Sequence, residues 1–179
     1  RKGPGIEFFQ KLKEQFGNGG IIAEDLGLIT DDVRALLKKT GYPGMKVLQF
    51  AFQNRCDNDY LPHNHIKNCV VYTGTHDNDT LLGWLDSTSE ENLSFIKEYI
   101  GSAADADSHK TAVSMIKTAL ESVADTVIIQ MQDILELGSY ARMNTPSTKT
   151  GNWQWRMKSD ALSDRLAEKL LHITRLYMR

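Results

Sequence analysis

Polar side chains capable of catalysis follow three separate apolar segments of this chain. Glu24 and Asp25 come directly after the run "IIA", and His76 and Asp77 lie in "YTGTHDNDT", just beyond the run "CVVY". A third group after the run "TVII" comprises Asp133, Arg142 and Asn144. If each apolar run is a strand of one parallel sheet, all three groups lie at the carboxyl ends of strands, where such folds bind ligands. We therefore expect one shared site.

Glu24 and Asp77 are the two carboxylates that we expect to act together. Reaction at a glycosidic bond needs one carboxylic acid that protonates the leaving oxygen, and a carboxylate that attacks or stabilises the oxocarbenium-like carbon. A glutamate partly shielded from water suits the first task, and Glu24 follows three apolar residues. Asp77 lies in a polar loop, where its negative charge can stabilise a developing cation. The pair predicts glycosidic chemistry.

Structural roles compete with catalysis for several of these residues. Glu24 and Asp25 can belong to a loop that caps a helix, and Asp77 or Asp79 can cap the helix expected to begin near Thr80. Each residue alone is weak evidence of a site. The convergence of three segments favours the catalytic interpretation.

Two short motifs invite other classes of function. The histidines of "HNH" at 63–65 can share a metal ion, but no further Cys or Glu pattern completes a zinc site. The pair "HD" at 76–77 also occurs in metal phosphohydrolases, which place it on helices, whereas here it follows a predicted strand. Trp153 and Trp155 either pack at a rim or stack on sugar rings. We expect no metal ion.

The apolar pattern alternates between helical and strand-like periods. It predicts helices at 6–16, 31–40, 79–86, 90–100 and 109–123, and a last helix between Leu162 and Tyr177. Ser87 and Glu90 have capping-box spacing for the helix at 90–100. Short apolar runs predict strands at 21–25, 46–52, 69–73 and 126–131. This alternation indicates an α/β fold of parallel βα units. A (β/α)8 barrel has about 250 residues, so we expect about half of one.

Composition restricts the class of protein. The chain has 179 residues, of which 41% are hydrophobic and 25% charged, with a net charge of -2. That charge gives no general attraction to nucleic acid or to anionic membranes, and no apolar run approaches the roughly 18 residues of a membrane span. Cys56 and Cys69 make no disulfide framework, so a reducing compartment is expected.

Five segments in order resemble motifs of the 4-alpha-glucanotransferases, the amylomaltases or disproportionating enzymes of glycoside hydrolase family 77. They are "IIAEDLG", "GYPGMKVLQFAF", "LPHNH", "VVYTGTHDNDT" and "ARMNTP…GNWQWR", and they span residues 21–156. The resemblance implies a catalytic (β/α)8 barrel of the alpha-amylase clan. It also implies a retaining double displacement, which passes an α-1,4-glucan segment from one malto-oligosaccharide to the 4-hydroxyl of another glucan. No cofactor is implied.

The resemblance assigns roles to four residues. Glu24 matches the general acid/base at the end of the fifth barrel strand, and Asp77 matches the transition-state stabiliser after the seventh. His76 matches a donor of hydrogen bonds to the sugar whose bond is cleaved. Asn144 matches a residue that faces the sugar subsites. Ser147 stands where family members often have glycine, which affects the conformation of a loop.

The nucleophile of the family has no counterpart in this sequence. That residue is an aspartate after the fourth strand, in a stretch with Arg, Asp and His, and no such stretch occurs here. We expect residues 1–179 to be the C-terminal half, about strands five to eight, of one catalytic barrel without a second domain. Its expected partners are the missing N-terminal half and malto-oligosaccharides or other α-1,4-glucans. We expect a cytoplasmic location, or a plastid in a plant or alga. The alternative is a non-catalytic or orphaned glucan-binding fragment.

Overall fold

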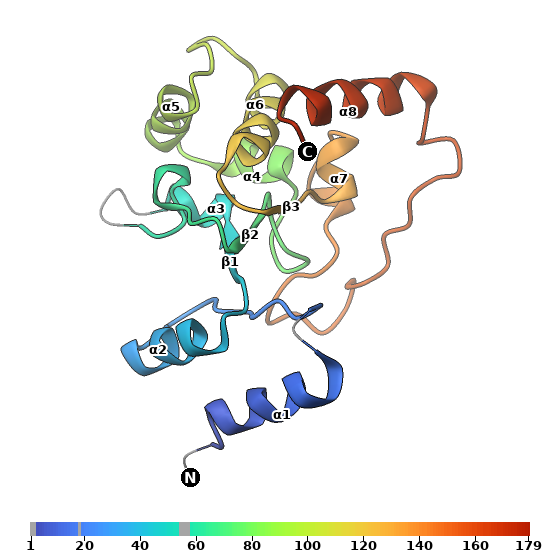
Figure 1. The fold of residues 1–179 in the computed structure, drawn as a ribbon. Coiled ribbons are helices and arrows are strands. Elements are labelled where there is room, and N and C mark those ends of the chain that lie inside the picture. The colour runs from blue at the N-terminus through green and yellow to red at the C-terminus, as the bar shows by residue number, and fades with distance from the viewer. Residues whose placement is uncertain (1–2, 18, 54–57) are drawn as a thin grey trace.

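The computed structural model describes residues 3–17, 19–53 and 58–179 (Figure 1). Its first elements are α1 (Ile6–Phe16), α2 (Asp31–Thr40), β1 (Gly44–Val47), α3 (Leu48–Ala51), η1 (Pro62–Asn64) and β2 (Cys69–Tyr72). They are followed by α4 (Leu81–Ser87), α5 (Glu90–Tyr99), α6 (Ser108–Glu121), β3 (Thr126–Ile128), α7 (Met131–Ile134), η2 (Ser139–Ala141) and α8 (Asp164–Leu176).

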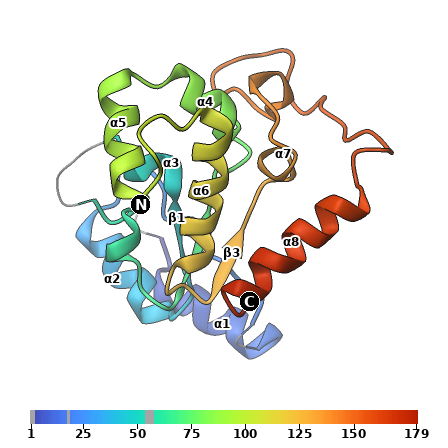
Figure 2. The same ribbon diagram turned by 90° about the horizontal axis from the view of Figure 1, so that it is seen from above.

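Three parallel strands form a sheet in the order β1-β2-β3. Gly44 of β1 is aligned with Cys69 of β2, and Val70 of β2 with Thr126 of β3. Helical segments connect the successive strands, as parallel neighbours require, and α4, α5 and α6 lie on one side of the sheet (Figures 1 and 2). The expected α/β fold of parallel units is confirmed for the part of the chain that the structure describes.

The expected strand at 21–25 is not formed. The Ala23 N–H donates to the carbonyl oxygen of the residue just before β1, at 2.9 Å, so the segment runs beside that strand. The N–H of Met45 in β1 is instead bound by Oδ1 of Asp25, at 2.6 Å. A side-chain carboxylate therefore stands where a backbone carbonyl would continue the ladder. Gly44 permits this approach, because a Cβ atom there would lie only 2.5 Å from Asp25 Oδ2.

The expected strand at 46–52 changes into a helix part-way. β1 ends at Val47, and the next four residues form the single turn of α3. Most side chains of this run are buried: Leu48, Gln49, Ala51 and Phe52. Without an exposed face, the pattern of apolar residues does not distinguish a strand from a helix here. The amide nitrogen Nε2 of Gln49 donates to a carbonyl oxygen of the loop before α4, at 2.8 Å.

The other helices and strands lie close to their expected positions. Thr80 caps α4 by accepting the N–H of Gly83 at 3.1 Å, and Asp107 and Ser163 cap α6 and α8 in the same way. The cap of α5 is Ser89 rather than the expected Ser87, because Ser87 still belongs to the last turn of α4. The expected strand at 126–131 ends at Ile128, since the chain turns into α7.

The main apolar core lies between β2 and the helices α4, α5 and α6 (Figure 2). Its most deeply buried side chains include Phe52, Val71, Leu81, Leu85, Ile96 and Met115. The ring centroid of Phe52 lies 5.5 Å from that of Tyr99 and 6.1 Å from that of Phe95. Burial of each such side chain contributes about 1.5–3 kcal/mol. This core holds the connection from β2 to α4, which carries His76 and Asp77.

Asp133 joins β2, α4 and α7 beneath the ends of the strands. Its side chain is only 2% exposed. Oδ2 accepts a hydrogen bond from the Thr73 hydroxyl at 2.6 Å, and Oδ1 accepts one from the N–H of Leu81 at 2.7 Å. Burial raises the pKa of Asp133 to about 6, although both hydrogen bonds favour the ionised form. Asp133 is therefore a structural link, and it does not lie in the expected site.

Replacement of Asp133 by Asn should have an effect on stability that depends on pH. The protonated carboxyl group that predominates near pH 4 keeps lone pairs on both oxygens, whereas Asn offers one acceptor to the two buried donors. We therefore expect a loss of about 1–3 kcal/mol in the free energy of unfolding near pH 4. The pKa of Asp133 is about 6 in the folded state against an ordinary 3.8, so the folded state binds the proton more tightly. The stabilisation that comes from this tighter proton binding is present below about pH 3.8 and is lost as the pH rises through about 6.

The difference between wild type and Asp133→Asn should therefore be smaller near pH 7 than near pH 4. Urea denaturation at both pH values measures it, with Asp86→Asn, an exposed aspartate on α4, as the control. A difference that grows with pH would contradict the account of the buried carboxylate.

Candidate active site

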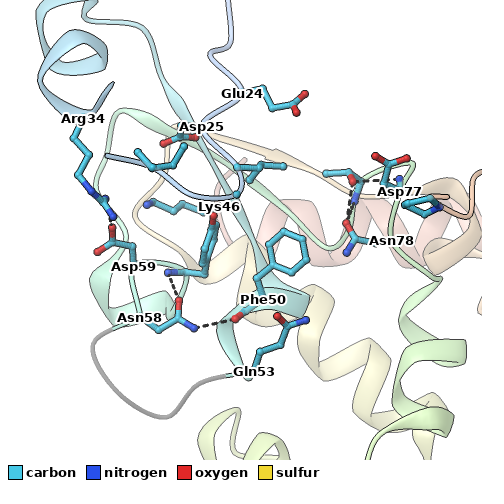
Figure 3. Close-up of a pocket in the computed structure, with 16 residues that line it drawn as sticks. Glu24, Asp25, Arg34, Lys46, Phe50, Gln53, Asn58, Asp59, Asp77 and Asn78 are labelled. Atoms are coloured by element: carbon cyan, nitrogen blue, oxygen red, sulfur yellow. Dashed lines mark hydrogen bonds and ion pairs between the residues drawn. The ribbon is translucent and has the colours of Figure 1, made fainter. Parts of the chain in front are cut away.

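A cavity of about 1050 Å³ opens at the carboxyl ends of β1 and β2 (Figure 3). Its walls come from residues between 24 and 29, from the end of β1 and the residues after it, from 58–60 and from 75–78. Pro146, in the loop after η2, closes part of one side. The volume is that of a site for a small organic ligand. Glu24 and Asp77 both line this cavity, as the sequence predicts.

Glu24 stands at the mouth of the cavity. Its side chain is exposed, so the expectation that the preceding apolar residues shield it from water is wrong for the described chain. The reason is that Ile22 itself is 44% exposed, so the apolar residues before Glu24 do not enclose it. The pKa of Tyr72, at the end of β2, is raised mainly by burial and to a smaller extent by the charge of Glu24. The charge of Glu24 therefore acts on the end of the neighbouring strand.

Asp25 has a different environment from that of Glu24. Its Oδ1 is bound to the N–H of Met45, and the carboxylate lies against Gly44. In Figure 3 the carboxyl groups of Glu24 and Asp25 lie on different sides of their segment. Asp25 thus anchors the segment to β1, and Glu24 remains free to meet a ligand.

A tight turn presents His76 and Asp77 after β2. Oδ1 of Asn78 accepts hydrogen bonds from the N–H and the hydroxyl of Thr75, both at 2.9 Å, and the Asn78 N–H donates to the Thr75 carbonyl at 3.1 Å. These bonds close the turn on itself. His76 and Asp77, between its ends, keep side chains that are about half exposed, 51% and 50%. The turn therefore directs both side chains toward solvent.

Asn144 from the loop after η2 is brought against this turn. Its side-chain Nδ2 donates to Oδ1 of Asp77 at 2.6 Å, and its backbone N–H donates to the His76 carbonyl at 3.1 Å. Nε2 of His76 lies 3.4 Å from the same Oδ1 atom. The structure thus unites three of the four predicted site residues.

Trp153 packs beside His76 with a ring-centroid distance of 5.1 Å. It has a φ of 61°, a left-handed conformation that is rare for a bulky residue, and it is 52% exposed. Its N–H donates to the Met143 carbonyl at 2.6 Å, which closes the loop. Ser147 also has a positive φ, 66°, a conformation that glycine adopts more readily than other residues.

The opposite wall of the cavity was not predicted from the sequence. Arg34 of α2 forms an ion pair with Asp59 at 2.7 Å, and the Lys46 ammonium lies 5.4 Å from the ring centroid of Tyr60. Burial, and then the charges of Asp25 and Asp59, raise the pKa of Tyr60. Arg34 and Asp59 are far apart in sequence, so only the fold shows that they meet.

The histidines of the "HNH" motif are bound within the protein. Nδ1 of His63 lies 2.8 Å from the Tyr99 hydroxyl. His65 is buried, with one ring nitrogen 2.9 Å from the Ser122 hydroxyl and the other 2.9 Å from the Tyr60 carbonyl oxygen. Burial lowers the pKa of His65, which favours the neutral form of its ring. Among the described residues, no three His, Cys, Asp or Glu side chains form a group that could hold a metal ion.

The described part of the chain has two further features that the sequence analysis considered. No helix there is both long and apolar enough to cross a membrane. Cys69 is a free, buried thiol whose Sγ lies 3.0 Å from the Ile66 carbonyl oxygen. Burial raises the pKa of this thiol, which makes it less reactive. Cys56 lies outside the described residues.

The chain is similar to known proteins over its whole length. It is 46% identical over 179 residues to a 4-alpha-glucanotransferase of Clostridium butyricum, covering 99% of this chain and 36% of the relative. It is 49% identical over 180 residues to the chloroplastic/amyloplastic 4-alpha-glucanotransferase of Arabidopsis thaliana, covering 99% of this chain and 31% of the relative. The chain thus spans about a third of the length of these curated relatives.

The solved structure of amylomaltase from Streptococcus agalactiae in complex with acarbose superposes on the whole chain with a TM-score of 0.92. The two are 36% identical, and the match covers 36% of the amylomaltase. Amylomaltase from Corynebacterium glutamicum, at 17% identity, has a TM-score of 0.65 over 94% of this chain and 30% of its own, and shows the same fold. The sequence profile of the 4-alpha-glucanotransferase family matches residues 1–163. This chain therefore belongs to the 4-alpha-glucanotransferase family.

Proposed function

We propose that residues 1–179 are part of a 4-alpha-glucanotransferase that transfers α-1,4-glucan segments between malto-oligosaccharides. The observation that carries this proposal is that Glu24 and Asp77 line one cavity, in a chain that belongs to this family. The acarbose bound to the Streptococcus agalactiae amylomaltase is consistent with sugar-like ligands in such a cavity. The enzyme acts in the cytoplasm, or in a plastid if the source is a plant or alga.

Glu24 is the general acid and base of the proposed reaction. It protonates the glycosidic oxygen as the bond breaks, and later it takes a proton from the 4-hydroxyl of the acceptor glucan. Its exposed position at the mouth of the cavity lets it reach a bound sugar. The remainder of the enzyme covers Glu24 and excludes water, which favours transfer to a sugar over hydrolysis.

Asp77 stabilises the positive charge that develops on the sugar. Asn144 and His76 both approach its Oδ1 atom, so Oδ2 is the oxygen that faces the reacting carbon. The two neighbours hold the carboxylate in one orientation before the reaction begins, as electrostatic stabilisation requires. His76 and Asn144 also present polar groups to the hydroxyls of the sugar.

The nucleophile is supplied from outside residues 1–179. We propose that this chain forms the C-terminal part, about strands five to eight, of one catalytic (β/α)8 barrel. Three observations support the proposal: the strands are parallel, β3 leaves Ile128 39% exposed, and the curated relatives are about three times as long. An unpaired edge strand with apolar side chains is suited to continue a sheet.

Replacement of Glu24 by Gln in the complete enzyme should remove most turnover. Gln keeps the shape and the hydrogen-bonding capacity of the side chain but cannot donate a proton to the leaving oxygen. We expect at least about a hundredfold lower kcat with oligosaccharide binding retained. Glucose release from maltotriose is the measurement, and Glu7→Gln on the exposed face of α1 is the control. Activity close to wild type in Glu24→Gln would remove Glu24 from the mechanism.

Replacement of Asp77 by Asn should lower kcat far more than it raises KM. The substitution preserves the shape but removes the negative charge that favours the developing cation. Steady-state kinetics with maltotriose separates the two constants, and Asp86→Asn serves as the matched control. A raised KM with unchanged kcat would mean that Asp77 only positions the substrate.

Added EDTA should leave the activity of the wild-type enzyme unchanged. Inactivation by EDTA that zinc or manganese reverses would instead support a metal-dependent mechanism.

Residues 1–179 alone should show no detectable disproportionation of maltotriose. A retaining site needs its acid and its nucleophile about 5–5.5 Å apart, and Asp25, the carboxylate next to Glu24, is bound to the N–H of Met45. Activity should appear when the N-terminal part is supplied, either covalently or as a separate chain. Robust glucose release by the purified 179-residue chain would overturn the proposed mechanism. Glucan binding without any activity in the complete protein would instead favour a glucan-binding fragment.

A further inference from the structure

The segment after η2 is fastened to the turn that carries Asp77 by more than the Asn144 side chain. Nη2 of Arg142 donates to the backbone carbonyl of Asp77 at 2.6 Å, and Nε of the same guanidinium donates to the carbonyl of Asn144 at 2.8 Å. One planar cation therefore bridges two carbonyl oxygens from two separate loops. Charge-assisted bonds of this length are stronger than neutral ones, and the fork of a guanidinium holds both acceptors in fixed relative positions.

We propose that Arg142 is a positioning residue for Asp77, acting through the backbone of the turn; this inference rests on the role proposed above for Asp77. Arg142 holds the peptide that follows the catalytic carboxylate. It also holds the backbone of Asn144, whose side chain binds the carboxylate itself. The rotamer of Asp77 and the position of its main chain are thus set by the same arginine.

The segment depends on such contacts because it has little regular structure of its own. Between η2 and α8 the chain has no helix or strand among the described residues, and most of its side chains are exposed. The upstream end is fastened by the Ser139 hydroxyl, which donates to Asp79 at 2.7 Å. Arg142 provides the next attachment along the chain. Without Arg142, Asn144 still binds the His76 carbonyl and the Asp77 carboxylate, but no cation fixes the Asp77 carbonyl relative to the Asn144 carbonyl.

The predicted effect is on the rate and not on substrate affinity or stability. A displacement of about 1 Å in a catalytic group can lower the rate about a hundredfold. Arg142 is only partly buried, so water can solvate the two carbonyl oxygens when the guanidinium is removed. The fold should therefore tolerate its loss.

Arg156 offers a matched control within the same loop. Its guanidinium also donates to two backbone carbonyls, those of Trp153 and Trp155, at 3.0 and 2.8 Å. Both acceptors belong to its own segment and neither lies on the turn at 75–78. Comparison of Arg142→Ala with Arg156→Ala thus separates the bridge to Asp77 from the general effect of losing an arginine in the loop.

The test uses the complete enzyme and maltotriose. We expect Arg142→Ala to lower kcat about tenfold to a hundredfold, with KM within about threefold of wild type. Arg156→Ala should retain a kcat close to wild type. Added guanidinium ion should partly restore kcat in Arg142→Ala and should not raise it in Arg156→Ala. Equal kcat in the two variants, or a raised KM with unchanged kcat in Arg142→Ala, would overturn the inference.

Two further measurements keep the inference separable from the proposed function. Amide hydrogen exchange at 75–78 should be faster in Arg142→Ala than in Arg156→Ala, whatever reaction the enzyme catalyses; equal exchange overturns the positioning role. Full activity of Glu24→Gln counts against the proposed function alone. If Arg142→Ala does not fold, Arg142→Lys decides, because an ammonium lacks the planar fork that fixes the two carbonyls relative to each other. A lower kcat with unchanged KM supports the inference, and wild-type kcat refutes it.

Discussion

The buried carboxylate of Asp133 holds together the parts of the molecule on which the site depends. It accepts hydrogen bonds from Thr73, at the end of β2, and from the N–H of Leu81, at the start of α4. The seven residues between these two contacts include the turn with His76 and Asp77. Because both ends of this connection are attached to one buried group, the turn emerges from a fixed base. The apolar core beneath α4 and α6 keeps that group dry, and this burial raises its pKa.

Close packing extends this rigidity to the next connection along the sheet. Asp79 accepts hydrogen bonds from the Thr80 N–H and from the Ser139 hydroxyl, so α4 and η2 share one carboxylate. Gly83 has no room for a side chain, because a Cβ atom there would overlap the hydroxyl of Ser139. The loop that carries Arg142 and Asn144 therefore begins at a defined place beside the turn. Asp133, Asp79 and Asp77 thus link the connection between β2 and α4 to the segment that runs from α7 through η2 into the following loop.

The side of the cavity that carries Glu24 is built more loosely. One backbone hydrogen bond from Ala23 and the Asp25 carboxylate attach this segment to β1. Glu24 is exposed, and apolar side chains such as Ile22 and Leu28 are exposed beside it. These features agree with a chain that spans about a third of the length of its relatives. In the proposed enzyme, the same surface meets the part of the barrel that bears the nucleophile.

The sequence by itself determined the parallel α/β fold, the family and the placement of Glu24 and Asp77 around one cavity. These depend on short-range patterns: apolar runs of strand length, helical periods, and polar motifs placed just after the strands. It did not determine that 21–25 forms no strand, because the Asp25 carboxylate takes the place of a backbone carbonyl. Nor did it determine that 48–51 is helical, because three of these four residues are buried and the helical period is hidden. The burial of Asp133, the exposure of Glu24 and the bridge made by Arg142 were decided by tertiary structure alone. Asp133 and Arg142 bind partners 52 to 65 residues away, and no local pattern in the sequence predicts which of these residues meet.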